Sequence, residues 1–77
     1  MIPDAAIAAA IARLTAARAP RTCCPSEVAR ALAEDWRPLM ADVRRVAAGM
    51  PEVVATQRGV EVDARTARGA IRLGRRP

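Results

Sequence analysis

The amino-acid sequence predicts a small, mainly α-helical α+β domain, in which three helices are followed by an antiparallel wing of two to three strands. As far as Met50, apolar residues recur at the three- to four-residue spacing of helices that bury one face. After Pro51, short valine-containing runs are separated by Arg58 and Gly59, a pattern typical of strands joined by a turn. This order is that of a winged helix-turn-helix, and we expect residues 1–77 to form one such domain.

The first helix is expected over residues 3–18. Pro3 suits the first turn of a helix, and the carboxylate of Asp4 complements the helix dipole at that end. Pro20 ends the helix, and the connector of residues 19–24 has room for one short strand that pairs with the later wing. Helical spacing predicts a buried stripe made of Ile7, Ala10, Ile11, Leu14 and Ala17.

Residues 25–50 are the stretch around which the chain is organised, because they indicate two helices joined by a tight turn at residues 33–35. Pro25 suits the first position of the shorter helix, with Cys24 or a neighbour as its cap. Glu27 adds a favourable negative charge to the first turn. We expect Arg30 to point away from the core and the buried side to consist of Val28, Ala31 and Leu32.

The second helix of this pair is expected over residues 36–49. Asp35 has the side chain of a helix N-cap, and Pro38 falls where the backbone donor is not yet needed. Gly49 and the proline that follows end the helix. The only aromatic residue is expected to be a largely buried anchor, and the whole apolar face is Trp36, Leu39, Met40, Val43, Val46, Ala47 and Met50.

The wing is expected over residues 53–73, with strands at 53–57 and 70–73 that pair antiparallel. Residues 58–69 form its broad loop, in which Val60 to Val62 alternate as a short third strand. One helical turn, capped by Asp63 and closed by Gly69, is expected later in the loop. Residues 74–77 are expected to fray as a basic tail.

The charge of the chain favours an anionic partner. The net charge is +5, and all 13 basic residues are arginine. GC-rich codons also produce arginine and alanine, so part of this excess is compositional. The surplus nevertheless lies mainly in residues 58–77, where six arginines face only Glu61 and Asp63. We expect duplex DNA as the partner, with an acidic protein surface as the alternative.

Arginines on the 36–49 helix and on the wing are the candidate contacts to DNA. Arginine donates two hydrogen bonds to guanine or binds phosphate, and the small Ala41 and Ala48 leave room for the helix in the major groove. The wing arginines would then lie over phosphates or the minor groove. An ordinary solvated helix face explains the helix arginines equally well. The candidate set is Arg37, Arg44, Arg45, Arg58, Arg65, Arg68 and Arg72.

The sequence argues against an enzyme, a cofactor and a metal site. It contains no histidine or tyrosine, and its two cysteines are adjacent. A bridge between Cys23 and Cys24 would be strained, so we expect two free thiols in a reducing cytoplasm, with Cys24 as a structural residue. No apolar run approaches the ~20 residues of a membrane span. The alanine-rich start lacks the basic residues of a signal peptide.

Several short motifs resemble a family of short bacterial proteins of unknown function with an expected winged-helix fold. The motifs are Cys24-Pro25-Ser26-Glu27-Val28-Ala29-Arg30, Trp36-Arg37, Leu39-Met40, Val43-Arg44, Thr56-Gln57-Arg58-Gly59, Val62-Asp63 and Arg68-Gly69-Ala70-Ile71-Arg72. The resemblance covers nearly the whole chain and implies the fold, but no activity. We expect a DNA-binding domain of the transcriptional-regulator class. A protein-interaction or dimerisation module of the same fold is the alternative.

Overall fold

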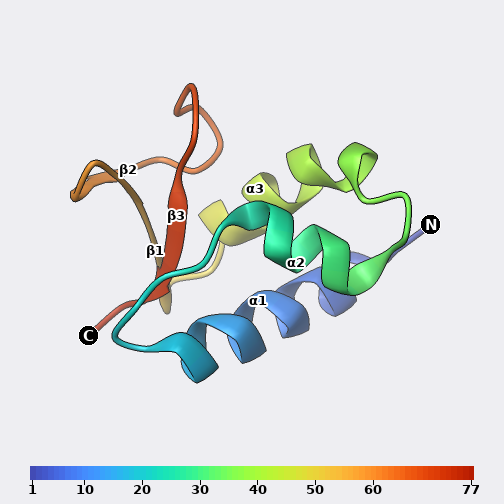
Figure 1. The fold of residues 1–77 in the computed structure, drawn as a ribbon, viewed down its shortest axis with the longest axis horizontal. Coiled ribbons are helices and arrows are strands. Elements are labelled where there is room, and N and C mark those ends of the chain that lie inside the picture. Colours follow the sequence, from blue (N-terminus) through green and yellow to red (C-terminus); the bar gives the residue numbers. More distant parts are fainter.

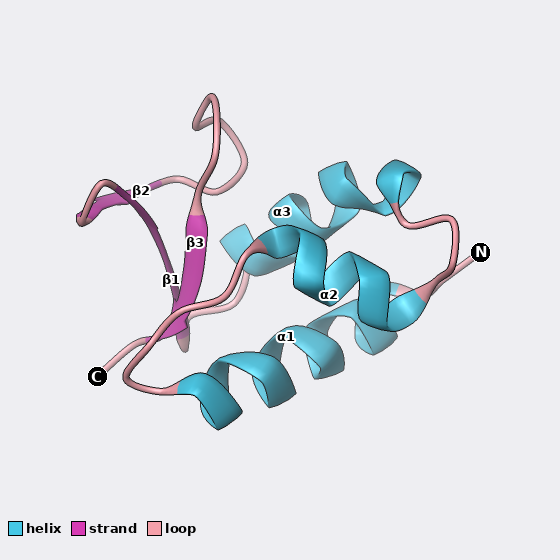
Figure 2. Ribbon diagram, viewed as in Figure 1, coloured by secondary structure: helices cyan, strands magenta, loops and turns pink.

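The computed structural model describes residues 1–77 and places three α-helices before a three-stranded antiparallel sheet (Figure 1). The helices pack together on one side of the molecule, and the sheet stands beside them (Figure 2). This arrangement confirms the predicted α+β class and its winged-helix layout. In chain order the elements are α1 (Asp4–Arg18), α2 (Pro25–Leu32), the 3₁₀ turn η1 (Arg37–Leu39), α3 (Met40–Ala48), β1 (Val53–Gln57), β2 (Val60–Val62) and β3 (Arg72–Arg75).

The sheet has the strand order β2-β1-β3, with β1 in the centre. Arg58 and Gly59 turn the chain between β1 and β2 with positive φ angles of 54° and 81°, the left-handed backbone of a tight hairpin turn. Val53 of β1 lies opposite Arg75 of β3, and Thr56 lies opposite Arg72. The antiparallel pairing of the first and last strands is therefore confirmed, as is the short third strand at β2.

The last strand begins two residues later than predicted, because Ala70 still belongs to the preceding loop. The side-chain amide of Gln57 donates hydrogen bonds to the carbonyls of Arg68 and Ala70, which holds this segment outside the backbone ladder. The expected frayed tail is also wrong. Gly74 and Arg75 lie in β3, and the backbone N–H of Arg76 donates to the carbonyl of Glu52 at 2.8 Å.

The core lies between the helices and the sheet, and α1 supplies Ile7, Ala10 and Ile11 to it. Thr15 is also fully buried, whereas Ala17, predicted to be buried, is exposed. The threonine hydroxyl donates to the carbonyl of Ile11 at 2.8 Å. Because the hydroxyl group is hydrogen-bonded within its own helix, its burial costs little free energy. A threonine can therefore occupy this core position.

The connector and α2 pack as predicted except at one position. Cys24 is the N-cap residue, and its backbone N–H donates to the carboxylate of Glu27 at 3.2 Å. Cys23 exchanges two backbone hydrogen bonds of 2.8 Å with Leu73, so the predicted short strand exists as a single bridge. On α2 it is Ala29 that is buried, whereas Ala31 is exposed.

The start of α3 differs from the prediction. Asp35 does not cap it. Instead Trp36 precedes the 3₁₀ turn η1, in which the N–H of Leu39 donates to the carbonyl of Trp36 at 3.0 Å. Pro38 lies in the first turn of η1, where its missing backbone N–H leaves no helical hydrogen bond unmade. Trp36 itself is half-buried against the edge of the core, not largely buried as predicted.

None of the helices combines the length and the apolar character that crossing a membrane requires.

Candidate nucleic-acid interface

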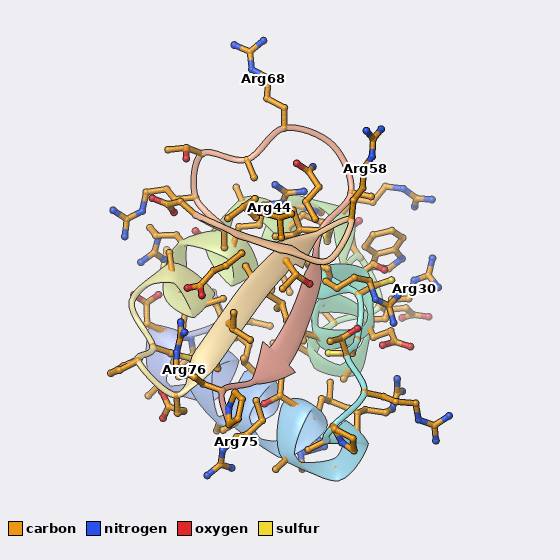
Figure 3. All side chains as sticks on the ribbon, turned by 90° about the vertical axis from the view of Figure 1, so that its left-hand side faces the viewer. Arg30, Arg44, Arg58, Arg68, Arg75 and Arg76 are labelled. Atoms are coloured by element: carbon orange, nitrogen blue, oxygen red, sulfur yellow. The ribbon has the colours of Figure 1, made fainter.

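Three of the seven candidate arginines lie on the wing with exposed, unpaired side chains. We define the wing loop as residues 63–71, between β2 and β3, and the wing arginines as Arg58, Arg65 and Arg68. None of the three guanidinium groups makes a hydrogen bond or an ion pair within the chain. Arg58 and Arg68 project away from the body of the molecule (Figure 3). Their guanidinium groups are therefore free to meet an anionic partner.

The wing loop has a defined shape, because its first turn is hydrogen-bonded. The Asp63 carboxylate accepts a bond from the N–H of Arg65 at 2.8 Å, and the Asp63 carbonyl accepts from Thr66 and Ala67 at 3.2 and 2.9 Å. This is the capped turn that the sequence predicted. Ala64 packs inward and is only 2% exposed. The loop therefore presents its arginines from a fixed backbone.

Arg44 joins α3 to the wing loop and does not point into solvent. Its guanidinium donates to the carbonyl of Ala67 at 2.7 Å and to the carbonyl of Gly69 at 2.6 Å. Gly69 has a φ of +85°, a conformation that favours glycine, and this orients its carbonyl group toward α3. Figure 3 places Arg44 beneath the loop. The structure thus gives Arg44 a positioning contact that the sequence pattern did not reveal.

Arg45 lies on the outer face of α3, where it is paired with two carboxylates. Its guanidinium donates to both carboxylate oxygens of Asp4 at 2.8 and 2.9 Å and to Asp42 at 3.3 Å. The bond from Arg45 holds the pKa of the Asp4 carboxyl group below its ordinary value. The same bonds raise the pKa of Arg45 further above its already high value. The pairing ties the start of α1 to α3.

The guanidinium groups of Arg37 and of Arg30 on α2 both lie over the indole ring of Trp36. The distances from the two guanidinium carbons to the ring centroid are 4.6 and 4.5 Å. Both are within the range of a cation–π contact, which leaves guanidinium donors available at the edge. Arg30 is a basic side chain beside the predicted site but is not among the seven candidates, because nothing in its local sequence pattern indicates this contact.

Arg72 faces the connector and not the wing. Its guanidinium donates to the hydroxyl and carbonyl oxygens of Thr22 at 3.0 and 2.9 Å and to the sulfur of Cys24 at 2.8 Å. Cys23 next to it is fully buried, and burial raises the pKa of its thiol. Both cysteines are free thiols. Arg72 therefore lies with a different group of residues from the wing arginines.

The wing arginines line two surface hollows, of which one is shared with α3. Arg65 reaches the hollow between α1 and α3, which Asp4, Arg45 and Met50 also line. Arg58 and Arg68 line a second hollow at the end of the wing. The exposed Ala41 and Ala48 lie on the outer face of α3. The seven candidates are thus distributed over a wing group, an α3 group and a connector residue.

The chain matches the model of a protein family over nearly its whole length. Residues 4–76 match the model of the family described as proteins of unknown function, DUF3253. The chain belongs to the DUF3253 family. This confirms the resemblance to an uncharacterised family that the sequence motifs indicated. No curated protein matches the chain significantly. In this DUF3253 domain no three histidine, cysteine, aspartate or glutamate residues are grouped closely enough to hold a metal ion.

Proposed function

We propose that this DUF3253 domain binds duplex DNA, with α3 against the major groove and the wing over neighbouring phosphates. The observation that carries the proposal is the set of three wing arginines, whose guanidinium groups are exposed and bonded to no carboxylate or carbonyl of the chain. Guanidinium groups with all their donors free suit phosphate oxygens. The net charge of +5 favours a polyanion as the partner.

The outer face of α3 supports the same docking geometry. Ala41 and Ala48 are exposed and small, which permits close approach to the floor of a groove. Arg37 stands at the start of this face and is exposed. Arg45 lies between the two alanines in the sequence, but Asp4 and Asp42 have to release it before it contacts a base. Arg37 is therefore the first candidate for base recognition.

Arg44 supports the proposal through position and not through contact. Its two hydrogen bonds to the wing loop fix the distance between α3 and the wing arginines. A rigid spacing favours binding because less conformational freedom is lost when both elements meet the duplex. Selective binding by such a domain suits a transcriptional regulator.

A protein-docking module is the alternative function, and it requires an uncovered apolar patch. Only Met1 and Val60 are large apolar side chains with high exposure, one at the N-terminus and one in β2. Two such residues are far fewer than a docking patch of several hundred Å² needs. The distribution of exposed side chains therefore favours an anionic partner.

A matched pair of double variants tests the proposal. Arg58→Ala with Arg68→Ala removes two wing charges, and Arg13→Ala with Arg75→Ala removes two charges elsewhere. All four side chains are exposed, and none has an internal partner. Figure 3 shows Arg75 at the opposite end of the molecule from Arg58 and Arg68. In fluorescence anisotropy at low salt, the wing variant should lose about tenfold or more in affinity for a random duplex and the control about threefold or less.

An equal loss in the two double variants would contradict the proposal, because it would mean that the duplex responds only to net charge. Undetectable binding of the unmodified domain at low salt would contradict it as well. In that case the protein-docking function becomes the leading candidate.

A further inference from the structure

A second basic surface lies away from the wing, around the connector between α1 and α2. A hollow there is lined by Arg18, Arg21, Thr22 and Arg72, and by no apolar residue. Arg18 ends α1, Arg21 and Thr22 belong to the connector, and Arg72 begins β3. Three guanidinium groups from three separate segments therefore converge on one depression of the surface.

The backbone around this hollow is held rigidly. Cys23 and Leu73 exchange two hydrogen bonds of 2.8 Å, which fasten the connector to β3. Gly74 lies so close that a Cβ atom at this position would come within 2.9 Å of the Thr22 methyl carbon. The absence of a side chain at Gly74 is thus what lets Thr22 pack against the strand. Thr22 in turn fixes the guanidinium of Arg72 through its hydroxyl and carbonyl oxygens.

The three arginines differ in how far the chain already uses them. Arg18 pairs with the carboxylate of Glu27 at 3.2 Å, and that bond holds the pKa of Glu27 below its ordinary value. Arg72 uses three of its five N–H groups on Thr22 and Cys24. The side chain of Arg21 is exposed and makes no hydrogen bond or ion pair within the chain. The group holds two oriented guanidiniums and one with every donor free.

The charge of the group selects the class of ligand. Three arginines and Glu27 sum to three positive charges minus one negative charge, or +2. A terminal phosphate group carries nearly two negative charges at neutral pH and offers three acceptor oxygens. A phosphodiester carries only one. No apolar residue lines the hollow, so we expect it to recognise the phosphate and to leave the rest of a ligand in solvent.

We propose that this hollow is a binding site for the terminal phosphate of a small phosphate monoester or for inorganic phosphate. Arg21 supplies the free donors, and Arg72 and Arg18 supply an oriented rim. The site is separate from the proposed DNA interface, because no wing arginine lines it.

The test titrates the ¹⁵N-labelled domain with inorganic phosphate, with methyl phosphate and with dimethyl phosphate, while chloride balances the ionic strength. Amide shifts of residues 18–24 and of Arg72 should saturate with the first two probes. Dimethyl phosphate, a phosphodiester with one charge, should bind about tenfold more weakly. Saturation by inorganic phosphate and not by methyl phosphate would support the site and identify the free ion as its ligand.

Arg21→Ala is the decisive variant, because the Arg21 side chain has no internal partner and its loss should leave the fold intact. It should weaken phosphate binding about tenfold or more, in line with the loss of charge-assisted hydrogen bonds. Arg13→Ala, which removes an equally exposed charge from α1, should leave phosphate binding unchanged.

Equal effects of the two variants, no saturable shift, or equal binding of dimethyl phosphate would overturn the site. A loss of duplex affinity in Arg21→Ala would instead assign the hollow to the DNA surface and overturn its role as a small-ligand site. The proposed DNA binding is tested separately, by the double variant of Arg58 and Arg68, so its failure would not affect the phosphate site.

Discussion

The guanidinium of Arg44 on α3 donates a hydrogen bond to the carbonyl oxygen of Gly69 on the wing loop, across 2.6 Å. A companion bond reaches the carbonyl of Ala67 at 2.7 Å. These two contacts hold α3 and the wing loop at a fixed spacing. The proposed function needs that spacing, because both elements would meet the duplex. Arg44 is therefore the residue on which the geometry of the proposed interface depends most.

Arg44→Ala should loosen the wing without unfolding the helices. Two hydrogen bonds from a charged donor are lost at a partly exposed site, so we expect a destabilisation of about 1–2 kcal/mol. Amide hydrogen exchange should accelerate in residues 63–71 and remain unchanged in α1. Arg44→Lys should not restore the stability, because one ammonium group does not reproduce the two hydrogen bonds that the guanidinium group donates to the two carbonyls. Unaltered exchange in the wing loop would contradict this role.

Trp36→Ala should be less damaging than the deletion of a fully buried ring. The indole is half-buried and makes cation–π contacts with Arg30 and Arg37. We expect a loss of about 2 kcal/mol from packing and the two cation–π contacts, and Trp36→Phe should recover part of it. Urea unfolding measures the change. A loss above about 4 kcal/mol would indicate a buried anchor instead, as the sequence alone suggested.

The two neighbouring thiols should react very differently. Cys23 is fully buried and its thiol pKa is raised, whereas Cys24 is only half-buried beside Arg72. Because the thiolate is the reactive form, brief alkylation of the native domain should label Cys24 and spare Cys23. Mass spectrometry of the digested protein locates the label. Replacing Cys24 by serine should leave DNA affinity unchanged, and preferential labelling of Cys23 would contradict the account.

Acid should weaken the fold through three exposed ion pairs. Bonds from Arg45, Arg18 and Arg76 lower the folded-state pKa of Asp4, Glu27 and Glu61, respectively. A lowered folded pKa adds stability above the unfolded value of about 4, and this stability is lost as the pH falls through the folded value. The melting temperature should therefore drop below about pH 4.5, by a small amount because exposed pairs contribute little.

A matched variant isolates one of the pairs. In Glu61→Gln the drop on acidification should be shallower than in the unmodified domain, because the pair with Arg76 no longer titrates. Thermal unfolding across the same pH range measures both drops. A steeper drop in this variant would contradict the claim that the Arg76–Glu61 pair is lost on acidification.

The order of elements and the hairpin turn could be predicted because they depend on local patterns. Helical spacing, Pro25, Gly49 and the pair Arg58-Gly59 each determine structure within a few residues. The contacts that define the candidate site could not be predicted in this way. Arg44 meets a carbonyl 25 residues away, and Arg45 meets a carboxylate 41 residues away.

The errors in burial have a related cause. A helical stripe predicts which face turns inward but does not fix its centre to within one residue. The choice between Ala17 and Thr15, or between Ala31 and Ala29, depends on which neighbour the helix packs against. Trp36 was predicted to be a core anchor because it is the only aromatic residue. The buried core contains no aromatic ring, and the half-buried indole contacts two arginines instead.

The salt dependence of duplex binding tests the central proposal most directly. Each arginine–phosphate contact should contribute about −0.9 to the slope of log affinity against log salt. Arg37 and the three wing arginines are the unpaired candidates, so we expect a slope near about −3.6, flattened by about 1.8 in the variant that lacks Arg58 and Arg68. Fluorescence anisotropy with a labelled random duplex measures both slopes. Absence of binding at low salt, or an identical slope in the wing variant, would contradict the account.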